Sequence, residues 1–270
     1  MNILFFKAAL TAYFLSTAGY AISLLVKRVI AARLSMWILS AAFLLQTFYF
    51  GFRCIETGQS PIHGIYDALS LVAWAMTGIY LIFQVKTKTR ILGAFVSPVA
   101  FLLMIIASVR LGDYVVLPTV LQGGLVTAHV ILSLTGEAFF ALASCAGAMY
   151  LIQDGLIKNK KGRNFSRLLP PLRDLDRINH MCLLAGFPLL TLGILTGSIW
   201  ARTAWGSRWQ WDPKQIWTIT VWFVYVLLLH QRLAIGWRGH KAAWFSIVAF
   251  AFLLLCVVAV GFSTTLHKFI

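Results

Sequence analysis

Eight apolar segments divide this chain, and each is about long enough to cross a lipid bilayer. One crossing takes roughly 20 consecutive apolar residues in a helix. The composition agrees, because a soluble globule would not carry 60% hydrophobic and only 11% charged residues. The chain is therefore predicted to be an all-α, polytopic membrane protein with about eight transmembrane helices in a single integral membrane domain, residues 1–270. The predicted segments are 3–25, 35–53, 67–84, 91–109, 122–152, 179–201, 217–234 and 243–263.

Basic residues lie mainly in alternate connections between these segments. Three follow the first segment, three follow the third, seven lie between residues 158 and 177, and three follow the seventh, so these connections hold 16 of the 23 Lys and Arg. By the positive-inside rule they face the cytoplasm, residues 153–178 form a cytoplasmic basic loop, and both termini are external. The net charge of +15 thus reflects membrane topology. The basic residues form no single face or tail that would indicate a nucleic-acid partner.

Residues 200–217, which include the connection between the sixth and seventh segments and the residues that flank it, hold five of the ten tryptophans. Residues 202–216 are predicted to form an external Trp-rich loop that also contains Asp212 and Pro213. Large flat side chains in a charge-poor, proline-restrained loop suit a large flat apolar ligand, and haem is the obvious candidate. We expect Asp212 to shape the loop by bonding its backbone or a nearby cation. The tryptophans are Trp200, Trp205, Trp209, Trp211 and Trp217.

Two histidines are predicted to lie near the level of this loop. His129 stands near the external end of the fifth segment, and His267 follows the external end of the eighth. Two neutral imidazoles on opposite faces of a haem would supply its axial ligands. The alternative is that His129 bonds a neighbouring carbonyl and that His267 is a solvated tail residue.

His230 lies deeper, thirteen residues after Trp217 on an uninterrupted apolar segment. At 1.5 Å per residue this is about 20 Å along a helix. An ionisable group within the hydrocarbon is a candidate functional residue. The alternative is a histidine at the cytoplasmic edge beside Arg232. No other histidine is expected at a clearly similar depth, so a second iron ligand would come from another subunit.

The remaining candidate groups give weaker signals. Glu137 follows His129 by eight residues and either orients a polar network or is buried in its neutral form. His63 is expected in an external loop as a turn residue or a further ligand. The four cysteines form no CxxC pair, so no thiol redox motif or covalent haem attachment site is encoded. We find no nucleophile and base pair, and we predict no catalytic residue.

The run GFPLLTLGILTGSIWARTAWGSRWQWDPKQIW, residues 186–217, closely resembles the tryptophan-rich WWD signature of the cytochrome c assembly family, particularly its CcsA/ResC branch in the system II pathway. The resemblance continues through Tyr225, the LLLHQR segment at His230 and the GWRG turn at 236–239. It covers residues 120–267 well. The external SPIHGIYDALSLVAW segment also looks similar to the corresponding N-terminal region of the family.

The resemblance implies a haem-handling protein of the bacterial cytoplasmic membrane. In the family the WWD loop binds haem at the external face between two external histidines, which match His129 and His267, while His230 matches a transmembrane histidine. Haem b, as cargo, would move to the external face and be presented, with a CcsB/ResB-type partner, to the CXXCH segment of an apocytochrome c. The chain would then be a subunit of a cytochrome c synthase complex that forms thioether bonds.

Three alternatives share parts of this pattern. A HemX-like regulator of haem biosynthesis would have a similar membrane core, but the complete signature and the paired external histidines favour assembly. A CcmC-like haem-delivery subunit resembles a six-span protein, so eight spans and His230 argue against it. A generic transporter is not favoured, because two matching halves with broken helices are not apparent.

Overall fold

The computed structural model describes residues 2–26, 29–58, 64–87, 89–111, 123–159 and 169–262. Within these ranges the chain is all-helical and contains no strand, which confirms the predicted class. Eight of the described helices are long and apolar enough to cross a membrane, as the sequence predicts. They are α1 (Asn2–Val26), α2 (Val29–Thr57), α3 (Ile65–Thr87), α4 (Gly93–Ala107), α5 (Gly124–Lys158), α7 (Leu172–Trp205), α8 (Pro213–Leu233) and α9 (His240–Phe262).

The helices α5 and α7 are longer than the apolar segments from which they were predicted. They contain 35 and 34 residues, whereas about 20 residues span the hydrocarbon. Hydropathy marks only the apolar part of a helix, but the helix continues until a backbone signal ends it. In α7 these signals are Pro171 immediately before the helix and Gly206, with a φ of 76°, immediately after it.

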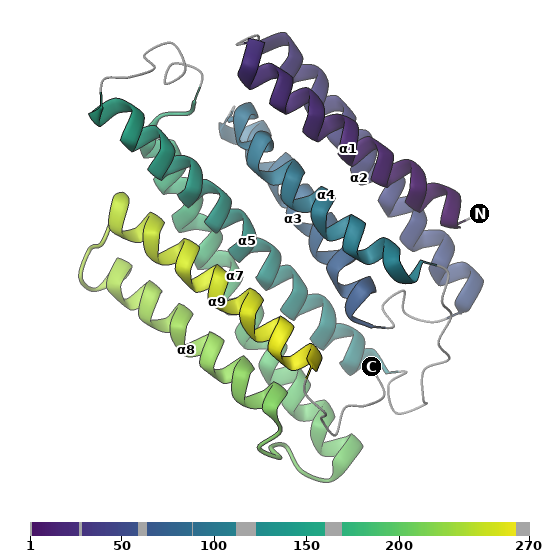
Figure 1. Ribbon diagram of the computed structural model, residues 1–270. Coiled ribbons are helices and arrows are strands. Elements are labelled where there is room, and N and C mark those ends of the chain that lie inside the picture. The colour runs from purple at the N-terminus through teal and green to yellow at the C-terminus, as the bar shows by residue number, and fades with distance from the viewer. Residues whose placement is uncertain are drawn as a thin grey trace.

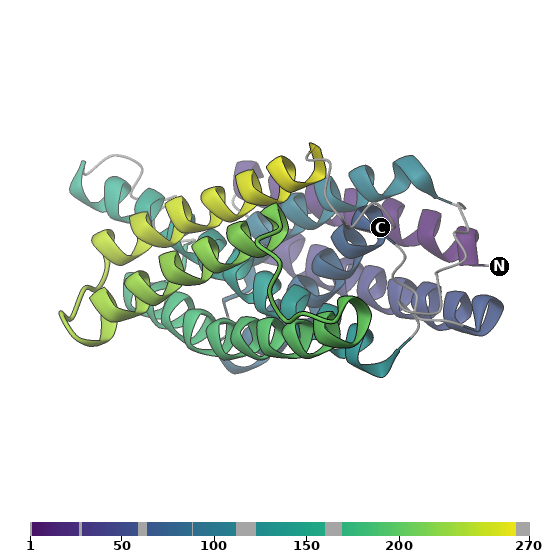
Figure 2. The same ribbon diagram turned by 90° about the horizontal axis from the view of Figure 1, so that it is seen from below.

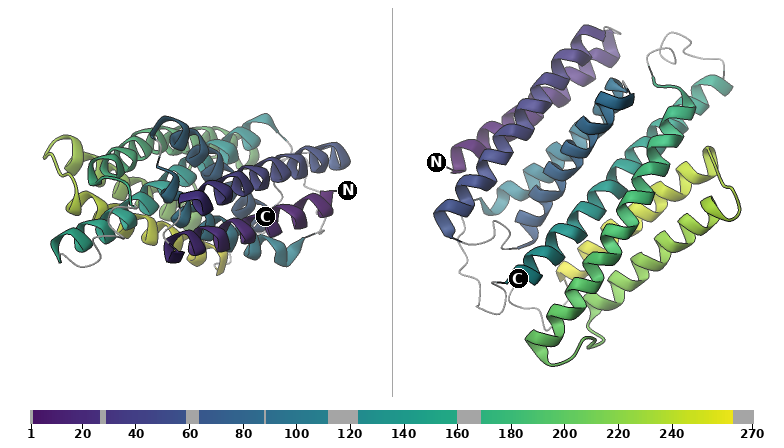
Figure 3. Two further views of the ribbon diagram at one scale, coloured as in Figure 1. Left: turned by 90° about the horizontal axis from the view of Figure 1, so that it is seen from above. Right: turned by 180° about the vertical axis from the view of Figure 1, so that it is seen from behind.

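The helices run roughly along a common direction and form two sets (Figure 1). The helices α1–α4 lie on one side and α5–α9 on the other, and α3 packs against α5 where the sets meet. Figure 3 shows the same division from behind, and Figure 2 shows the bundle from below. The start of α1, the end of α9 and the α7–α8 connection lie at one end of the bundle (Figure 1), as an even number of alternating crossings requires.

The interior of the first helix set contains a polar network. The Tyr13 hydroxyl donates to Gln46 Oε1 at 2.8 Å, and Gln46 Nε2 donates to the carbonyl oxygen of Ser70 at 2.8 Å. These three residues come from α1, α2 and α3, and all are buried. Hydrogen bonds between helices hold membrane bundles together where lipid supplies no hydrophobic driving force. This network thus fixes how the first three helices pack.

Three of the four cysteines pack inside the helix bundle. Cys145, Cys182 and Cys256 are buried, and Cys54 is exposed. All four are free thiols. The helix packing in the described residues therefore depends on side-chain contacts and not on disulfides among these cysteines.

Candidate functional site

The Trp-rich loop connects the end of α7 to the start of α8. Residues at its two ends terminate the first helix and initiate the second. Gly206 adopts a left-handed conformation, and its amide donates to the Arg202 carbonyl at 3.0 Å. Glycine adopts this conformation without a Cβ penalty, so it commonly ends helices. At the other end, Asp212 is the N-cap of α8 and Pro213 is its first residue, where a missing N–H costs nothing.

Asp212 shapes the loop, as the sequence predicts. Its Oδ2 accepts a hydrogen bond from the Lys214 amide at 3.1 Å, and the Asp212 residue is only 4% exposed. A second contact holds the loop to the same helix, because Gln215 Oε1 accepts from the Gln210 amide at 2.9 Å. The last loop residues are thus tied to the first turn of α8.

The tryptophans of this region contact one another in pairs. Trp200 and Trp205 meet edge to face with ring centroids 4.9 Å apart, and Trp209 and Trp211 do so at 5.5 Å. Trp217 lies on α8 and contacts Phe252 of α9, with ring centroids 6.4 Å apart. None of the five rings is buried in the core, so aromatic faces remain available at this end of the bundle.

Trp211 has an unusual backbone. Its φ is 55°, and among the described residues it is the one non-glycine position with a positive φ. A bulky residue in this region is strained, and such strain collects at functional sites. The side chain is 74% exposed, so packing of the ring in the core does not explain the conformation. The cap at the next residue, Asp212, holds the strained turn in place.

His129 lies on α5 and faces α7. Its Nδ1 is 2.7 Å from the carbonyl oxygen of Gly193, and the residue is half-buried. The alternative interpretation of a helix histidine bonded to a carbonyl is therefore correct as far as Nδ1 is concerned. It does not exclude iron ligation, because metal-binding histidines commonly donate their other ring N–H to a backbone carbonyl.

The same turn of α7 contacts both His129 and the Trp-rich loop. Gly197 lies directly against the His129 ring, and the next residue, Ser198, donates through Oγ to the Arg208 carbonyl at 3.5 Å. His129 and the aromatic loop are thus brought to one end of one helix. The second proposed external ligand, His267, lies outside the described residues, as does His63.

His230 lies in the last turn of α8, three residues before the helix ends at Leu233. Its side chain is exposed on the outer surface of the bundle, whereas Tyr225 and Arg232 of the same helix are buried. Phe223 and Leu227 precede His230 at helical spacing and are also exposed. The structure therefore does not bring His230 and His129 together.

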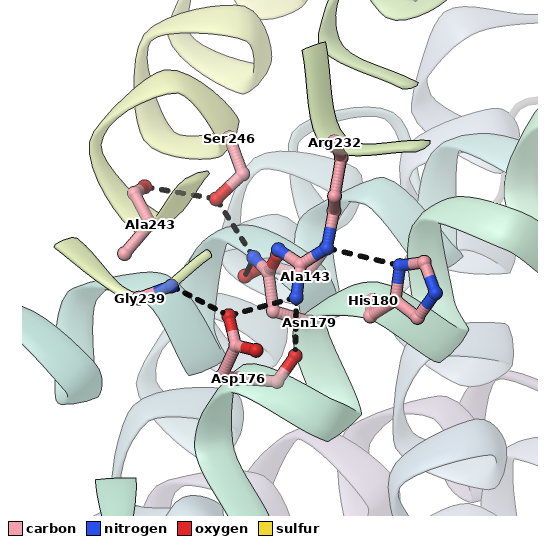
Figure 4. A network of polar contacts seen from close by, with 8 residues as sticks. All are labelled: Ala143, Asp176, Asn179, His180, Arg232, Gly239, Ala243 and Ser246. Atoms are coloured by element: carbon pink, nitrogen blue, oxygen red, sulfur yellow. Dashed lines mark hydrogen bonds and ion pairs between the residues drawn. The ribbon is translucent and has the colours of Figure 1, made fainter. Parts of the chain in front are cut away.

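A polar cluster around Arg232 joins α7, α8 and α9 at the end of the bundle opposite the Trp-rich loop (Figure 4). The guanidinium donates to Asp176 Oδ1 at 2.7 Å, to Asn179 Oδ1 at 2.7 Å and, through Nε, to His180 Nδ1 at 2.9 Å. Asp176 also accepts from the Gly239 amide at 3.0 Å. This cluster is not predictable from the sequence.

This cluster corrects one prediction. We expected no histidine at a depth similar to that of His230, but His180 contacts Arg232, only two residues along α8. The predicted segment gave no sign of this contact, because α7 starts seven residues before that segment and so extends further past His180. The two imidazoles still occupy different settings, since His180 bonds the buried Arg232 and His230 faces outward.

Glu137 lies on α5 one turn before Phe140. The Phe140 ring stacks on Tyr225 of α8, with centroids 3.6 Å apart and planes inclined by 10°. Glu137 is half-buried between the level of His129 and this stack. It belongs to the interior of the second helix set and not to the Trp-rich loop.

The glycines of α7 that contact His129 were not among the site residues predicted from the sequence. Gly193 and Gly197 form a GxxxG pattern, which lets helices approach closely in membranes. That pattern was available in the sequence. What it could not reveal is that the facing side chain is His129.

Comparison with known proteins places these features in a family. The family model described as "Cytochrome C assembly protein" matches residues 62–267. A "Cytochrome c biogenesis protein CcsA" of Chlamydomonas reinhardtii is 31% identical over 218 residues, covering 77% of this chain and 60% of that protein. The CcsA of Prochlorococcus marinus is 28% identical over 252 residues, covering 83% and 80%.

A solved structure has a similar fold. The chain described as "Cytochrome c Heme Lyase CcmF" superimposes with a TM-score of 0.67 at 14% sequence identity, and the match covers 97% of this chain and 49% of that one. At this identity the similarity concerns the fold alone. This chain therefore corresponds in fold to about half of that larger protein.

Proposed function

Because this chain belongs to the Cytochrome C assembly protein family, we propose that it is a haem-handling membrane protein of cytochrome c biogenesis. In this proposal it moves haem to the external membrane face and presents it for covalent attachment to apocytochrome c. The observation that carries the proposal is that His129 and the Trp-rich loop contact the same turn of α7. One ligand nitrogen and a set of flat rings are thus available at one end of the bundle.

Each part of this end has a role in the proposal. The Nδ1 of His129 bonds a carbonyl, which leaves Nε2 to bind iron. His267 is proposed as the second axial ligand. The rings of the loop would contact the faces and edges of the porphyrin, while Asp212 and Pro213 hold the loop in shape. The residues proposed to contact or support haem here are Trp205, Trp209, Trp211, Asp212, Pro213 and Trp217.

We assign His230 to an earlier step, as a ligand for haem on its way from the cytoplasmic side. Its outward orientation supports a site completed by another subunit, because the exposed residues that precede it on the same helix face, Phe223 and Leu227, are apolar. A CcsB/ResB-type membrane protein is the proposed partner. An exposed histidine on the same helix face as Phe223 and Leu227 would be costly in lipid unless a partner covered it.

The proposed reaction requires positioning more than acid-base catalysis. Each cysteine thiol of a CXXCH segment adds across a haem vinyl group, so that sulfur bonds one vinyl carbon, the proton ends on the other, and no group leaves. Holding haem by its iron and its faces leaves the vinyl edges accessible to the thiols. The chain would act as a subunit of a cytochrome c synthase complex, with haem b as cargo, in the cytoplasmic membrane of a bacterium.

The two related alternatives have less support. The curated relatives described above are CcsA proteins, which favours assembly over a HemX-like regulator. Eight helices long enough to cross a membrane disfavour the six-span CcmC-like branch.

Purification with and without the proposed partner tests the function. We expect the complex to retain haem with the absorption spectrum of a six-coordinate, low-spin iron. Trp209→Ala combined with Trp211→Ala should lower haem per folded protein. Trp37→Ala is the matched control, because Trp37 is 64% exposed on α2, far along the chain from the loop. A complex that carries no haem, or equal haem in all variants, would refute the proposal.

A further inference from the structure

The helices α5 and α7 pack through glycines at three levels. A Cβ atom at Gly186 would lie 3.0 Å from the Gly136 carbonyl oxygen, and one at Gly193 would lie 3.0 Å from the Ser133 amide nitrogen. Such distances leave no room for a side chain. The two backbones therefore approach closely along an antiparallel seam.

At the end of this seam nearest the Trp-rich loop, the group of α5 that faces α7 is the imidazole of His129. A Cβ atom at Gly197 would lie 2.6 Å from Nδ1 and 2.7 Å from Cε1 of His129. Only a residue without a side chain allows the ring to rest on α7 at this position. One turn further in, the Gly193 carbonyl oxygen lies 2.7 Å from the same Nδ1.

This hydrogen bond determines which ring nitrogen carries the proton. A carbonyl oxygen can only accept, so Nδ1 must be the donor. In the neutral imidazole Nε2 then holds the free lone pair, which is the form that binds iron. The surface at Gly197 restricts rotation of the ring while the Gly193 carbonyl fixes its tautomer.

We propose that Gly193 and Gly197 are positioning residues that orient His129 for iron ligation. This inference rests on the proposed function, in which His129 is an axial ligand of haem. Groups that orient a ligating histidine typically contribute 10- to 100-fold to metal affinity. A methyl group at position 197 is thus expected to displace the ring and weaken haem retention by about 10- to 100-fold.

The seam also provides a matched control. At Gly186 a Cβ atom would lie 2.8 Å from Phe140 Cε1, so Gly186→Ala causes a comparable clash in the same helix pair. It stands eleven residues from Gly197, about 16 Å along the helix, and does not touch His129. A second control is Gly155→Ala on α5, where no atom lies within 4 Å of the added carbon.

The test uses the complex with its partner and compares Gly197→Ala, Gly186→Ala, Gly155→Ala and His129→Ala. Haem per folded protein, the low-spin spectrum and recovery with added imidazole are measured for each. We expect Gly197→Ala to resemble His129→Ala, with imidazole restoring retention in both. Gly186→Ala should be less stable but keep the parent spectrum and haem per folded protein, and Gly155→Ala should match the parent.

The outcomes separate this inference from the proposed function. If His129→Ala changes haem retention but Gly197→Ala does not, or if Gly186→Ala loses as much haem, the positioning role is wrong. If His129→Ala itself has no effect, the ligand assignment in the proposed function is wrong. Nitrogen-15 NMR of the histidine-labelled, haem-free chain covers the case in which Gly197→Ala fails to fold. In the parent chain the His129 signal must show the proton on Nδ1. A proton on Nε2 would overturn the inference.

Discussion

The Nη2 atom of Arg232 lies 2.7 Å from Oδ1 of Asp176, and this ion pair joins α8 to α7 at the end of the bundle away from the Trp-rich loop. The Arg232 side chain is 3% exposed and that of Asp176 is 24% exposed. The pair also positions the α8–α9 turn, because Asp176 accepts from the Gly239 amide. The last turn of α8, which carries His230, is thereby anchored to α7.

We expect Arg232→Ala to destabilise the protein strongly. Removing one partner of a buried pair leaves the other charge uncompensated and costs about 3–5 kcal/mol. The partial exposure of Asp176 favours the lower end of that range. Thermal unfolding in detergent measures the effect, and Arg238→Ala is the control because Arg238 is exposed on the nearby turn. Equal stability of the two variants would show that the pair contributes little.

Replacing the cap of α8 should loosen the Trp-rich loop. Asp212→Ala removes the acceptor of the Lys214 amide, and loss of an N-cap typically costs about 1 kcal/mol. Asp212→Asn should retain most of the stability, because asparagine also caps well. Limited proteolysis within residues 206–212, together with the unfolding midpoint, reports both effects. The prediction fails if the alanine and asparagine variants behave alike.

At position 211, stability and haem retention should change in opposite directions. Trp211→Gly removes a side chain that is strained at a φ of 55°, so the variant should be at least as stable as the parent. It also removes a ring that is 74% exposed and proposed to contact haem, so haem per folded protein should fall. A variant that loses stability and haem in parallel would argue that Trp211 is merely structural.

His230→Ala should lower haem at the external loop without affecting folding. Its side chain is exposed, and surface substitutions usually change stability by no more than about 0.5 kcal/mol. Haem per folded protein and membrane abundance are measured side by side, with His240→Ala as the control because His240 is also exposed at the start of α9. An unchanged ratio of haem to folded protein would reject a role in haem transit.

The membrane orientation is tested with reporter fusions. We expect reporters at Gly206 and after Ile270 to be external and one at Arg238 to be cytoplasmic, because the basic connections follow the positive-inside rule. A cytoplasmic reporter at Gly206 would exclude haem presentation to an external apocytochrome.

Several features were predictable because they depend on neighbouring residues alone. The length of an apolar run determines whether it can cross a bilayer, so all eight helices were identified. The Asp212-Pro213 pair is a local helix start, and its role in shaping the loop followed from those two residues. The predicted helix ends were less accurate where polar turns extend α7 beyond its apolar part.

The orientation of side chains around each helix was not predictable. In a soluble helix the apolar face points inward, but a membrane helix is apolar on both its lipid-facing and its inward-facing sides. The sequence around His230 therefore could not indicate that this side chain points outward while Arg232 points inward. The depth of His180 was missed for a related reason, since it depends on how α7 is aligned with α8.

The sequence by itself determined the helix class, the number of helices long enough to cross a membrane and the position of the Trp-rich loop, because hydropathy and capping residues act over short distances. Only the tertiary structure decided that His129 rests on Gly197 with Nδ1 bonded to Gly193, and that Arg232 binds Asp176. These contacts join residues more than 50 positions apart. They depend on the register between packed helices, and in lipid that register is set by close glycine packing and interhelical hydrogen bonds.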